Sequence, residues 1–217
     1  ATLRDTFGHT DFLPGQQEIL TAVFQGRDCV AVLPTGGGKS LCFQLPAVLQ
    51  GGVTLVVSPL IALMKDQVDV LKERGIAAAR LDFSLGTEEA LALYDALRRN
   101  ELKLLYVAPE QLRNRSFLRT VEQREIACWV FDEAHCLSKW GHDFRPEYLE
   151  IGPVLADHPD ARGLACTSTA TPYVRDEIIT RLALPADTPQ LVRGFARPNL
   201  SLRVLEVERA TDRRRTV

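Results

Sequence analysis

A glycine-rich run near the start of the sequence suggests a phosphate-binding loop. Its sequence is Pro34-Thr35-Gly36-Gly37-Gly38-Lys39-Ser40, and apolar segments flank it on both sides. Glycines let backbone N–H groups approach phosphate oxygens, and a helix N-terminus adds partial positive charge. We therefore expect Lys39 to lie against the β- and γ-phosphates of a nucleotide and the Ser40 hydroxyl to bind Mg²⁺. Leu33 stands where the strict pattern has glycine, so the loop is a relaxed variant. A glycine turn with a chance lysine is the alternative, and the strand and helix predicted on either side disfavour it.

Two adjacent carboxylates, Asp132 and Glu133, end a second apolar run. Ligands of doubly wound sheets bind at the carboxyl ends of the strands. We expect Asp132 to hold Mg²⁺ through water and Glu133 to orient and deprotonate an attacking water. Adjacent acids are common on surface loops, and it is the phosphate loop upstream that makes this pair informative. His135 could be an ordinary structural residue, but its place directly after the pair favours a coupling role.

The segments around these motifs alternate between two hydrophobic patterns. Short apolar runs, expected to be strands covered on both faces, occupy Asp28–Leu33, Val53–Ser58, Ala77–Leu81, Lys103–Ala108, Ala127–Asp132, Gly163–Thr167 and Gln190–Arg193. Longer helical patterns occupy Gly15–Gln25, Lys39–Leu49, Ile61–Arg74, Thr87–Asn100 and Pro172–Leu182. The alternation predicts an α/β fold, a mostly parallel sheet with helices on both faces.

Composition narrows the class of protein. The chain has 217 residues, of which 46% are hydrophobic and 25% charged, and its net charge is −2. This balance is ordinary for a globular domain, so a nucleic-acid partner has to be argued from local sites. The five cysteines show neither a CxxC pair nor zinc-ligand spacing, and no apolar stretch approaches the roughly 20 residues that cross a bilayer. We expect an intracellular protein, cytoplasmic or nuclear according to its source, with no membrane contact and no zinc in this segment.

Longer motifs resemble the RecQ family of superfamily 2 DNA helicases. The resemblance rests on the phosphate loop, on Asp132-Glu133-Ala134-His135 and on residues 136–148, whose sequence is Cys-Leu-Ser-Lys-Trp-Gly-His-Asp-Phe-Arg-Pro-Glu-Tyr. Further segments that are similar to family motifs are Phe7-Gly8, Phe12–Gln16, Ser58–Val68, Ala108–Glu110, Thr167–Pro172 and Arg197–Asn199. The resemblance spans nearly the whole chain and implies a RecA-like P-loop fold.

The resemblance implies that ATP is the substrate, with Mg²⁺, and that DNA is the polymer acted on. The Gln16 amide would read the adenine edge, and His9 would stack on the base. Trp140, Phe144 and Arg145 would sense single-stranded DNA by stacking and charge. Core packing is the alternative for the two aromatic residues, but their polar neighbours favour an exposed loop. The other residues implied in DNA binding or coupling are Ser58, Thr167 and Thr169.

Some positions depart from the family pattern. The family usually has arginine at Leu13 and an aromatic residue at His9, and both changes weaken the inference about base specificity. Ser168, Lys139 and Gln111 stand where alanine, glutamine and a basic residue are usual. None of these changes removes a group that phosphoryl transfer requires.

We place one RecA-like lobe over residues 1–199 and a linker, or the start of a second lobe, over residues 200–217. No second strand–helix series comes after Asn199, so we expect a fragment of a longer helicase whose second RecA-like lobe supplies an arginine to the reaction. Such a fragment should bind ATP·Mg²⁺ weakly, hydrolyse it poorly and not unwind duplex. Two alternatives remain open, an RNA helicase or duplex translocase lobe and a nucleotide- or DNA-binding module without turnover. Intact Lys39, Asp132 and Glu133 argue against the last.

Overall fold

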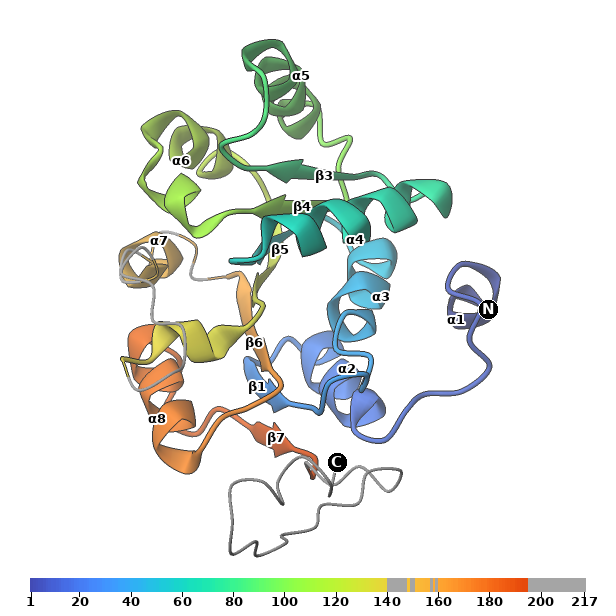
Figure 1. Cartoon of the computed structure of the whole chain (residues 1–217), viewed down its shortest axis with the longest axis vertical. Coiled ribbons are helices and arrows are strands. Elements are labelled where there is room, and N and C mark those ends of the chain that lie inside the picture. Colours follow the sequence, from blue (N-terminus) through green and yellow to red (C-terminus); the bar gives the residue numbers. More distant parts are fainter. Residues whose placement is uncertain (140–147, 149–150, 157, 159, 195–217) are drawn as a thin grey trace, which may run out of the picture.

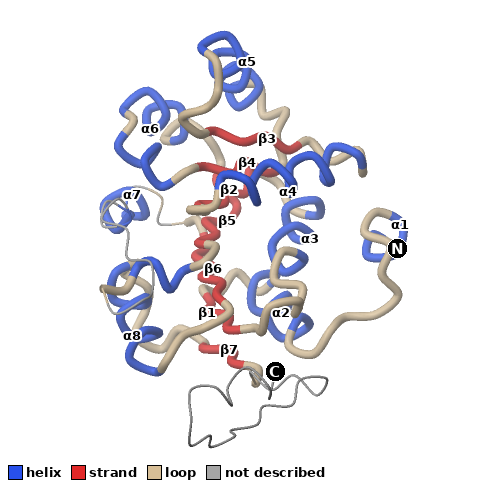
Figure 2. Tube along the Cα trace, in the orientation of Figure 1, coloured by secondary structure: helices blue, strands red, loops and turns tan. Residues whose placement is uncertain are grey.

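A parallel sheet forms the centre of the molecule, as Figure 2 shows. The structure, a computed structural model, describes residues 1–139, 148, 151–156, 158 and 160–194. Seven strands lie in the order β3-β4-β2-β5-β6-β1-β7, and every neighbouring pair is parallel. Their bounds are β1 Cys29–Val32, β2 Val53–Val57, β3 Ala78–Leu81, β4 Leu104–Val107, β5 Ile126–Phe131, β6 Arg162–Thr167 and β7 Gln190–Val192.

Helices cover both faces of the sheet (Figure 1). One face carries α2 (Gln16–Phe24), α3 (Leu41–Leu49) and α4 (Ile61–Glu73), with the short α1 (Thr2–Asp5) beyond them. The other face carries α5 (Thr87–Arg98), α6 (Arg115–Val121), α7 (Ile151–Ala156) and α8 (Pro172–Arg181). Two 3₁₀ turns, η1 (Pro109–Arg113) and η2 (Ala134–Leu137), come after β4 and β5. The predicted α/β class is thus confirmed, and in the described part the sheet is wholly parallel.

Alternate strand residues supply the two cores. Along β1, Val30 and Val32 belong to the cluster under α5–α8, whereas Cys29 and Ala31 belong to the cluster under α2–α4. Successive strand side chains point to opposite faces, so a strand buried on both sides must be apolar at every position. This requirement is why β1, β4 and β5 are continuous apolar runs rather than alternating ones.

The three short helices α1, α6 and α7 were not predicted, and α6 shows why. The helix α6 spans only Arg115–Val121 and begins at Asn114, whose side chain accepts hydrogen bonds from Ser116 N (3.0 Å) and Phe117 N (3.3 Å). Its buried face includes Phe117 and Val121. Seven residues are too few to display a helical period, and only the capping asparagine marks the start.

The expected domain boundary after residue 199 lies outside the described residues and stays a prediction. The linker or second-lobe start expected over residues 200–217 also stays a prediction, because residues 195–217 are not described.

Candidate nucleotide site

The motif residues lie along one edge of the sheet. The phosphate loop comes after β1, Thr167 ends β6, Asp132 comes after β5 and Ser58 after β2, and these four strands are adjacent in the order β2-β5-β6-β1. Val32 pairs with Thr167 and Val57 with Phe131, so the strands end at the same level. Because all the strands are parallel, segments from four separate parts of the sequence meet at their carboxyl ends.

The phosphate loop depends on its glycines. Gly36 and Gly38 have φ of 81° and 66°, the left-handed region that side chains disfavour. Gly37 has no such φ, but a Cβ there would lie 2.9 Å from the Pro34 carbonyl oxygen. The helix α3 begins directly after the loop, so the partial positive charge of its N-terminus lies beside the loop.

Leu33 explains why the loop can depart from the strict pattern. Its side chain is fully buried in the core under α2–α4, and its N–H donates to the Thr167 carbonyl at 3.1 Å. The backbone of Leu33 thus continues the pairing with β6 one residue past the end of β1, and its buried side chain packs against the phosphate loop. Glycine at this position would leave a cavity in that core.

The two acids lie close enough to Lys39 for its charge to act on both of them. Burial and the charge of Glu133 raise the pKa of Asp132 to about 6, against the opposing effects of the Glu133 N–H, Lys39 and His135. The hydrogen bond from His135 lowers the pKa of Glu133, and the Lys39 ammonium contributes in the same direction. Glu133 N donates to Asp132 Oδ1 at 3.0 Å. Lys39 therefore acts electrostatically on both carboxylates, as a shared phosphate site requires.

A chain of side chains leads from Glu133 to β6. His135 Nδ1 lies 3.3 Å from Glu133 Oε2 and 2.9 Å from Thr167 Oγ1. Thr167 Oγ1 in turn lies 3.2 Å from the Thr169 carbonyl oxygen and 3.3 Å from its N–H. The Cys136 sulfur and the Glu133 carboxylate raise the pKa of His135 to about 10. The imidazole is thus charged at neutral pH and connects the acid pair to the turn after β6.

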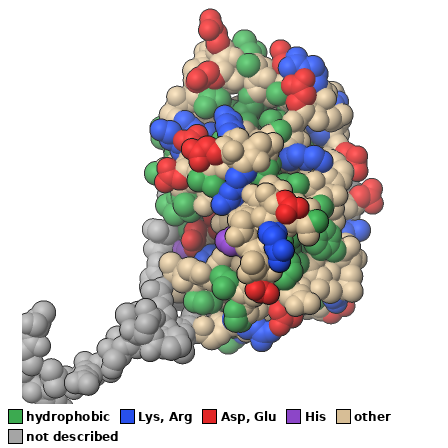
Figure 3. Space-filling view, turned by 90° about the vertical axis from the view of Figure 1, so that its right-hand side faces the viewer, with side chains coloured by type: hydrophobic (Ala, Val, Ile, Leu, Met, Phe, Trp, Pro, Cys, Tyr) green, Lys and Arg blue, Asp and Glu red, His purple; other side chains and the backbone are tan. Residues whose placement is uncertain are grey.

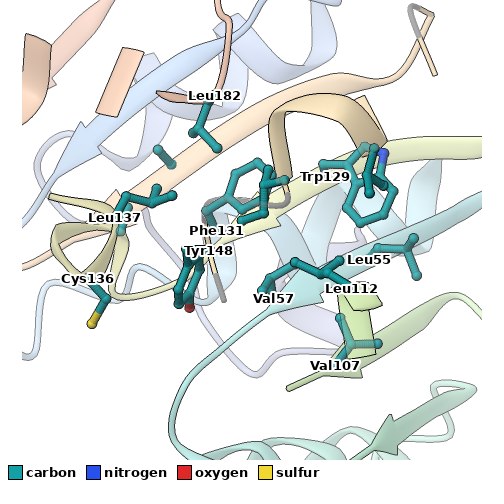
Figure 4. Close-up of a cluster of buried hydrophobic side chains, with 14 of the residues drawn as sticks. Leu55, Val57, Val107, Leu112, Trp129, Phe131, Cys136, Leu137, Tyr148 and Leu182 are labelled. Carbon is teal, nitrogen blue, oxygen red and sulfur yellow. The ribbon is translucent and has the colours of Figure 1, made fainter. Parts of the chain in front are cut away.

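Burial of η2 fixes this arrangement. Ala134 and Leu137, on either side of His135, are fully buried, and Figure 4 shows Leu137 in one cluster with Phe131 and Tyr148. Glu133, just before η2, adopts a φ of 49°, a conformation that costs on the order of 1–3 kcal/mol outside glycine. Packing of η2 against the core holds the backbone in this turn.

A pocket of about 360 Å³ lies beside the phosphate loop. It is lined by residues that include His9, Leu13, Gln16, Gly38 and Ser40. The Gln16 amide is buried, with 2% exposure, and both its polar atoms have backbone partners. Its Nε2 donates to the Gly38 carbonyl at 2.9 Å, and its Oε1 accepts from Leu13 N at 2.8 Å. The structure thus brings Gln16 and His9 together with the phosphate loop in a space within the size range of small-ligand sites, about 300–1,000 Å³.

The family model of the DEAD/DEAH box helicases matches residues 13–178, from the start of the pocket to α8. The chain belongs to the DEAD/DEAH box helicase family. The acid box Asp132-Glu133-Ala134-His135 is the four-residue motif that gives the second half of this family name.

Relatives of this helicase chain confirm the RecQ resemblance. The chain is 42% identical over 200 residues to ATP-dependent DNA helicase RecQ of Haemophilus influenzae, covering 92% of this chain and 32% of that protein. It is 41% identical to RecQ of Bacillus subtilis, covering 93% and 34%, and 41% identical to ATP-dependent DNA helicase Q5 of Rattus norvegicus, covering 92% and 21%. The chain therefore spans about a third or less of the length of these relatives.

Solved structures agree on the fold. The helicase MrfA is similar with a TM-score of 0.69 at 18% identity, covering 87% of this chain and 31% of that one. The Hef helicase domain of Pyrococcus furiosus is similar with a TM-score of 0.65 at 20% identity, covering 90% and 40%. These similarities confirm the helicase-type RecA-like fold.

The described part of this helicase chain places Ser58 away from solvent. Its side chain is 1% exposed, its Oγ has no hydrogen-bond partner among the described residues, and its N–H donates to the Val107 carbonyl at 3.1 Å. The Ser58 hydroxyl is thus not exposed in the described part of the chain, and its part in DNA binding stays a prediction. Trp140, Phe144 and Arg145 lie outside the described residues, so their part in DNA sensing stays a prediction.

The distribution of charged side chains on the side covered by α1–α4 does not indicate a binding surface for a polyanion. Figure 3 shows Lys, Arg, Asp and Glu side chains interspersed on that face. Among the described helices, none combines the length and the apolar composition that a bilayer crossing needs. The described residues also contain no cluster of three or more His, Cys, Asp or Glu side chains arranged for a metal ion.

Several residues of this pocket were not predicted as site residues. Among them, Gln44 and Arg74 both line the pocket beside the phosphate loop. Gln44 is the one polar residue within the otherwise apolar helix α3, and that exception was a usable signal. Arg74 has no sequence signal, because nothing in the chain marks which residue beyond the end of α4 reaches the pocket.

Proposed function

We propose that this chain is the first motor lobe of a RecQ-type, ATP-dependent DNA helicase. The observation that carries the proposal is the electrostatic proximity of Lys39 to Asp132 and Glu133 at one edge of the sheet. A phosphate loop alone would fit any nucleotide-binding module. A phosphate loop that lies near one acid able to bind a metal ion, Asp132, and a second acid able to orient a water, Glu133, fits the hydrolysis of a triphosphate.

The residues of the site fit Mg²⁺ as well as ATP. Asp132 is a half-buried carboxylate whose charge is disfavoured even with Lys39 nearby, and a divalent cation would stabilise that charge. Mg²⁺ commonly binds one or two carboxylates together with substrate phosphates, and the Ser40 hydroxyl and Asp132 would supply the protein side of such a site. When bound, the ion would neutralise charge on the phosphates.

The chain's own groups then divide the work of hydrolysis. The loop N–H groups and Lys39 bind and orient the β- and γ-phosphates. The Glu133 carboxylate, whose pKa is lowered by the hydrogen bond from His135, orients the attacking water and accepts its proton. His135 passes any displacement of Glu133 to Thr167 and so to the turn at Thr169.

The partners in this proposal are DNA and a second lobe. Single-stranded DNA would bind near the segment of Trp140, Phe144 and Arg145, and a second RecA-like lobe would close the cleft with an arginine, a contribution of about 10³–10⁵ in rate where it has been measured. The helicase Lhr of Mycobacterium smegmatis, of similar fold with a TM-score of 0.62, is solved bound to ssDNA and AMP-PNP. Action on DNA places the protein inside the cell.

The test uses the longer protein that contains this chain, with ATPase activity measured without nucleic acid and with single-stranded DNA or RNA. Single-stranded DNA should stimulate turnover more than RNA does. Glu133→Gln should leave ATP binding within about two-fold and abolish turnover, and Lys39→Ala should weaken binding itself. Glu122→Gln, an exposed carboxylate outside the site, is the matched control.

Three outcomes would contradict the proposal. Stimulation by RNA alone would assign the lobe to RNA. Unchanged turnover in Glu133→Gln would remove that residue from its role as base. ATP binding without turnover in the unsubstituted longer protein would leave a nucleotide-binding module.

A further inference from the structure

An arginine from outside the motifs lines the nucleotide pocket. Arg74 lies directly after α4, and its Cζ is 5.6 Å from the centre of the Phe7 ring. Phe7 itself is 3% exposed and lines the same pocket. This distance is within the range of a cation–π contact. The buried ring therefore supports one side of the guanidinium at the wall of the pocket.

The end of α4 holds Arg74 in place. Gly75 comes next with a φ of 73°, Gly75 N donates to the Lys72 carbonyl at 2.9 Å, and Ile76 N donates to the Leu71 carbonyl at 2.9 Å. These two bonds form a Schellman cap, and the buried Leu71 and Ile76 supply the apolar contact that accompanies such caps. The backbone at Arg74 is thus fixed by hydrogen bonds on both sides.

A hydrogen bond between helices orients the same face of α4. Gln67 precedes Arg74 by two helical turns, so both side chains lie on one face. Gln44 Nε2, from α3, donates to Gln67 Oε1 at 2.7 Å and to Tyr106 OH at 3.1 Å. Gln44 also lines the pocket. The face of α4 that carries Arg74 is therefore turned toward α3 and the pocket.

The base of a bound nucleotide has need of a partner besides Gln16. In this structure the Gln16 side chain is 2% exposed and its amide already bonds to Leu13 N and the Gly38 carbonyl, so it offers little surface to a base in the pocket. A planar guanidinium, in contrast, stacks on a base without giving up a hydrogen bond. The Arg74 side chain lines the pocket and is exposed to solvent on its outer face.

We propose that Arg74 is the platform on which the base of the bound nucleoside triphosphate stacks, with the Phe7 ring behind it. The proposal rests on the proposed function, in that the phosphate loop binds the triphosphate. Stacking depends on the size of the ring and tolerates its identity. Arg74 therefore provides affinity for purines over pyrimidines and does not separate adenine from guanine.

Calorimetric titration of the chain with ATP, GTP, UTP and inorganic tripolyphosphate tests the proposal. Arg74→Ala should weaken ATP and GTP binding about ten-fold, weaken UTP binding less and leave tripolyphosphate unchanged, since one stacked base corresponds to a loss of about this size. Arg74→Lys keeps the charge without the plane and should resemble Arg74→Ala. Lys72→Ala, in the last turn of α4 but not in the pocket wall, is the matched control.

Unchanged tripolyphosphate affinity in Arg74→Ala shows that the variant is folded with an intact phosphate loop. The proposal is overturned if Arg74→Ala binds ATP as the unsubstituted chain does, if tripolyphosphate loses affinity by the same factor, or if Arg74→Lys restores ATP binding. The last two results would assign the effect to charge on the phosphates. An unsubstituted chain that binds neither ATP nor tripolyphosphate would refute the proposed function instead.

Discussion

Replacement of Asp132 by asparagine should make the nucleotide-free chain more stable at neutral pH. The carboxylate is half-buried beside Glu133, and its pKa rises from the ordinary 3.8 to about 6. That value already includes the favourable effects of Lys39 and His135, so the charged form is disfavoured on balance. Asparagine keeps the oxygen that accepts from Glu133 N, at 3.0 Å in the structure, and removes the charge.

The magnitude comes from the linkage between proton binding and folding. A difference of one pH unit in pKa corresponds to about 1.4 kcal/mol, so the Asp132 shift corresponds to roughly 3 kcal/mol, and residual solvent exposure lowers this toward about 1 kcal/mol. The sign is that of an acid whose pKa is raised on folding: the folded state holds the proton more tightly. The free energy of unfolding therefore falls as the pH rises from about 4 to about 6. Below and above this range, Asp132 causes no further change of the free energy of unfolding with pH.

Urea denaturation at several pH values, without nucleotide and with a chelator, measures the effect. Near pH 4 the unsubstituted chain and Asp132→Asn should differ little, and above pH 6 the variant should be more stable by about 1–3 kcal/mol. For a chain of this size that corresponds to roughly 2–12 °C in Tm. Mg²⁺ with ATP should then stabilise the unsubstituted chain more than the variant, because only the former keeps the carboxylate.

Asp69→Asn, an exposed carboxylate on α4, is the control and should show no comparable pH-dependent gain. A variant at Asp132 that is less stable at pH 7, or more stable by the same amount at every pH, would refute the reasoning. Either result would mean that burial does not disfavour the Asp132 charge.

Two further substitutions probe the loop and the link to β6. Gly38→Ala should lower the free energy of unfolding by on the order of 1–3 kcal/mol and weaken ATP binding, because φ is 66° and the new Cβ would overlap Gln16 Nε2. Denaturation measures the loss of stability, and calorimetric titration measures the loss of ATP affinity. Gly86→Ala is the control, because φ at Gly86 is not positive. Thr167→Val removes the hydroxyl that lies 2.9 Å from His135 Nδ1. In the longer protein it should reduce the stimulation of ATPase activity by DNA at least several-fold while the affinity for ATP stays the same. Equal stimulation in the variant and the unsubstituted protein would exclude a role for the contact between His135 and Thr167.

The strands and the nucleotide motifs were predictable because their signals are local. β1 and β5 are apolar at every position, as strands covered on both faces must be, and each ends directly at a chemical motif. Parallel pairing then places Lys39 and Asp132 at one edge whatever the details of packing. This is why the two motifs could be expected at one edge of the sheet from spacing and residue type alone.

The parts that could not be predicted depend on contacts distant in sequence. The bond between Gln16 and Gly38 and the contact between Phe7 and Arg74 join segments that no periodic pattern relates. The burial of the Ser58 hydroxyl was not predicted from its motif either, because it depends on how β2 and β4 pair. Burial of a polar residue at a strand end is set by tertiary packing, which residue type does not report.

The strand β6 lies between β1 and β5 and so sets the distance between the phosphate loop and the acid pair. One intervening strand separates the loop that would hold a triphosphate from the acids that would act on it by about 10 Å, two inter-strand distances. Small residues at Ala165 and Cys166 let the helices on both faces approach this strand closely. A bulkier side chain there would widen or tilt the gap, so activity could be lost with every motif residue intact.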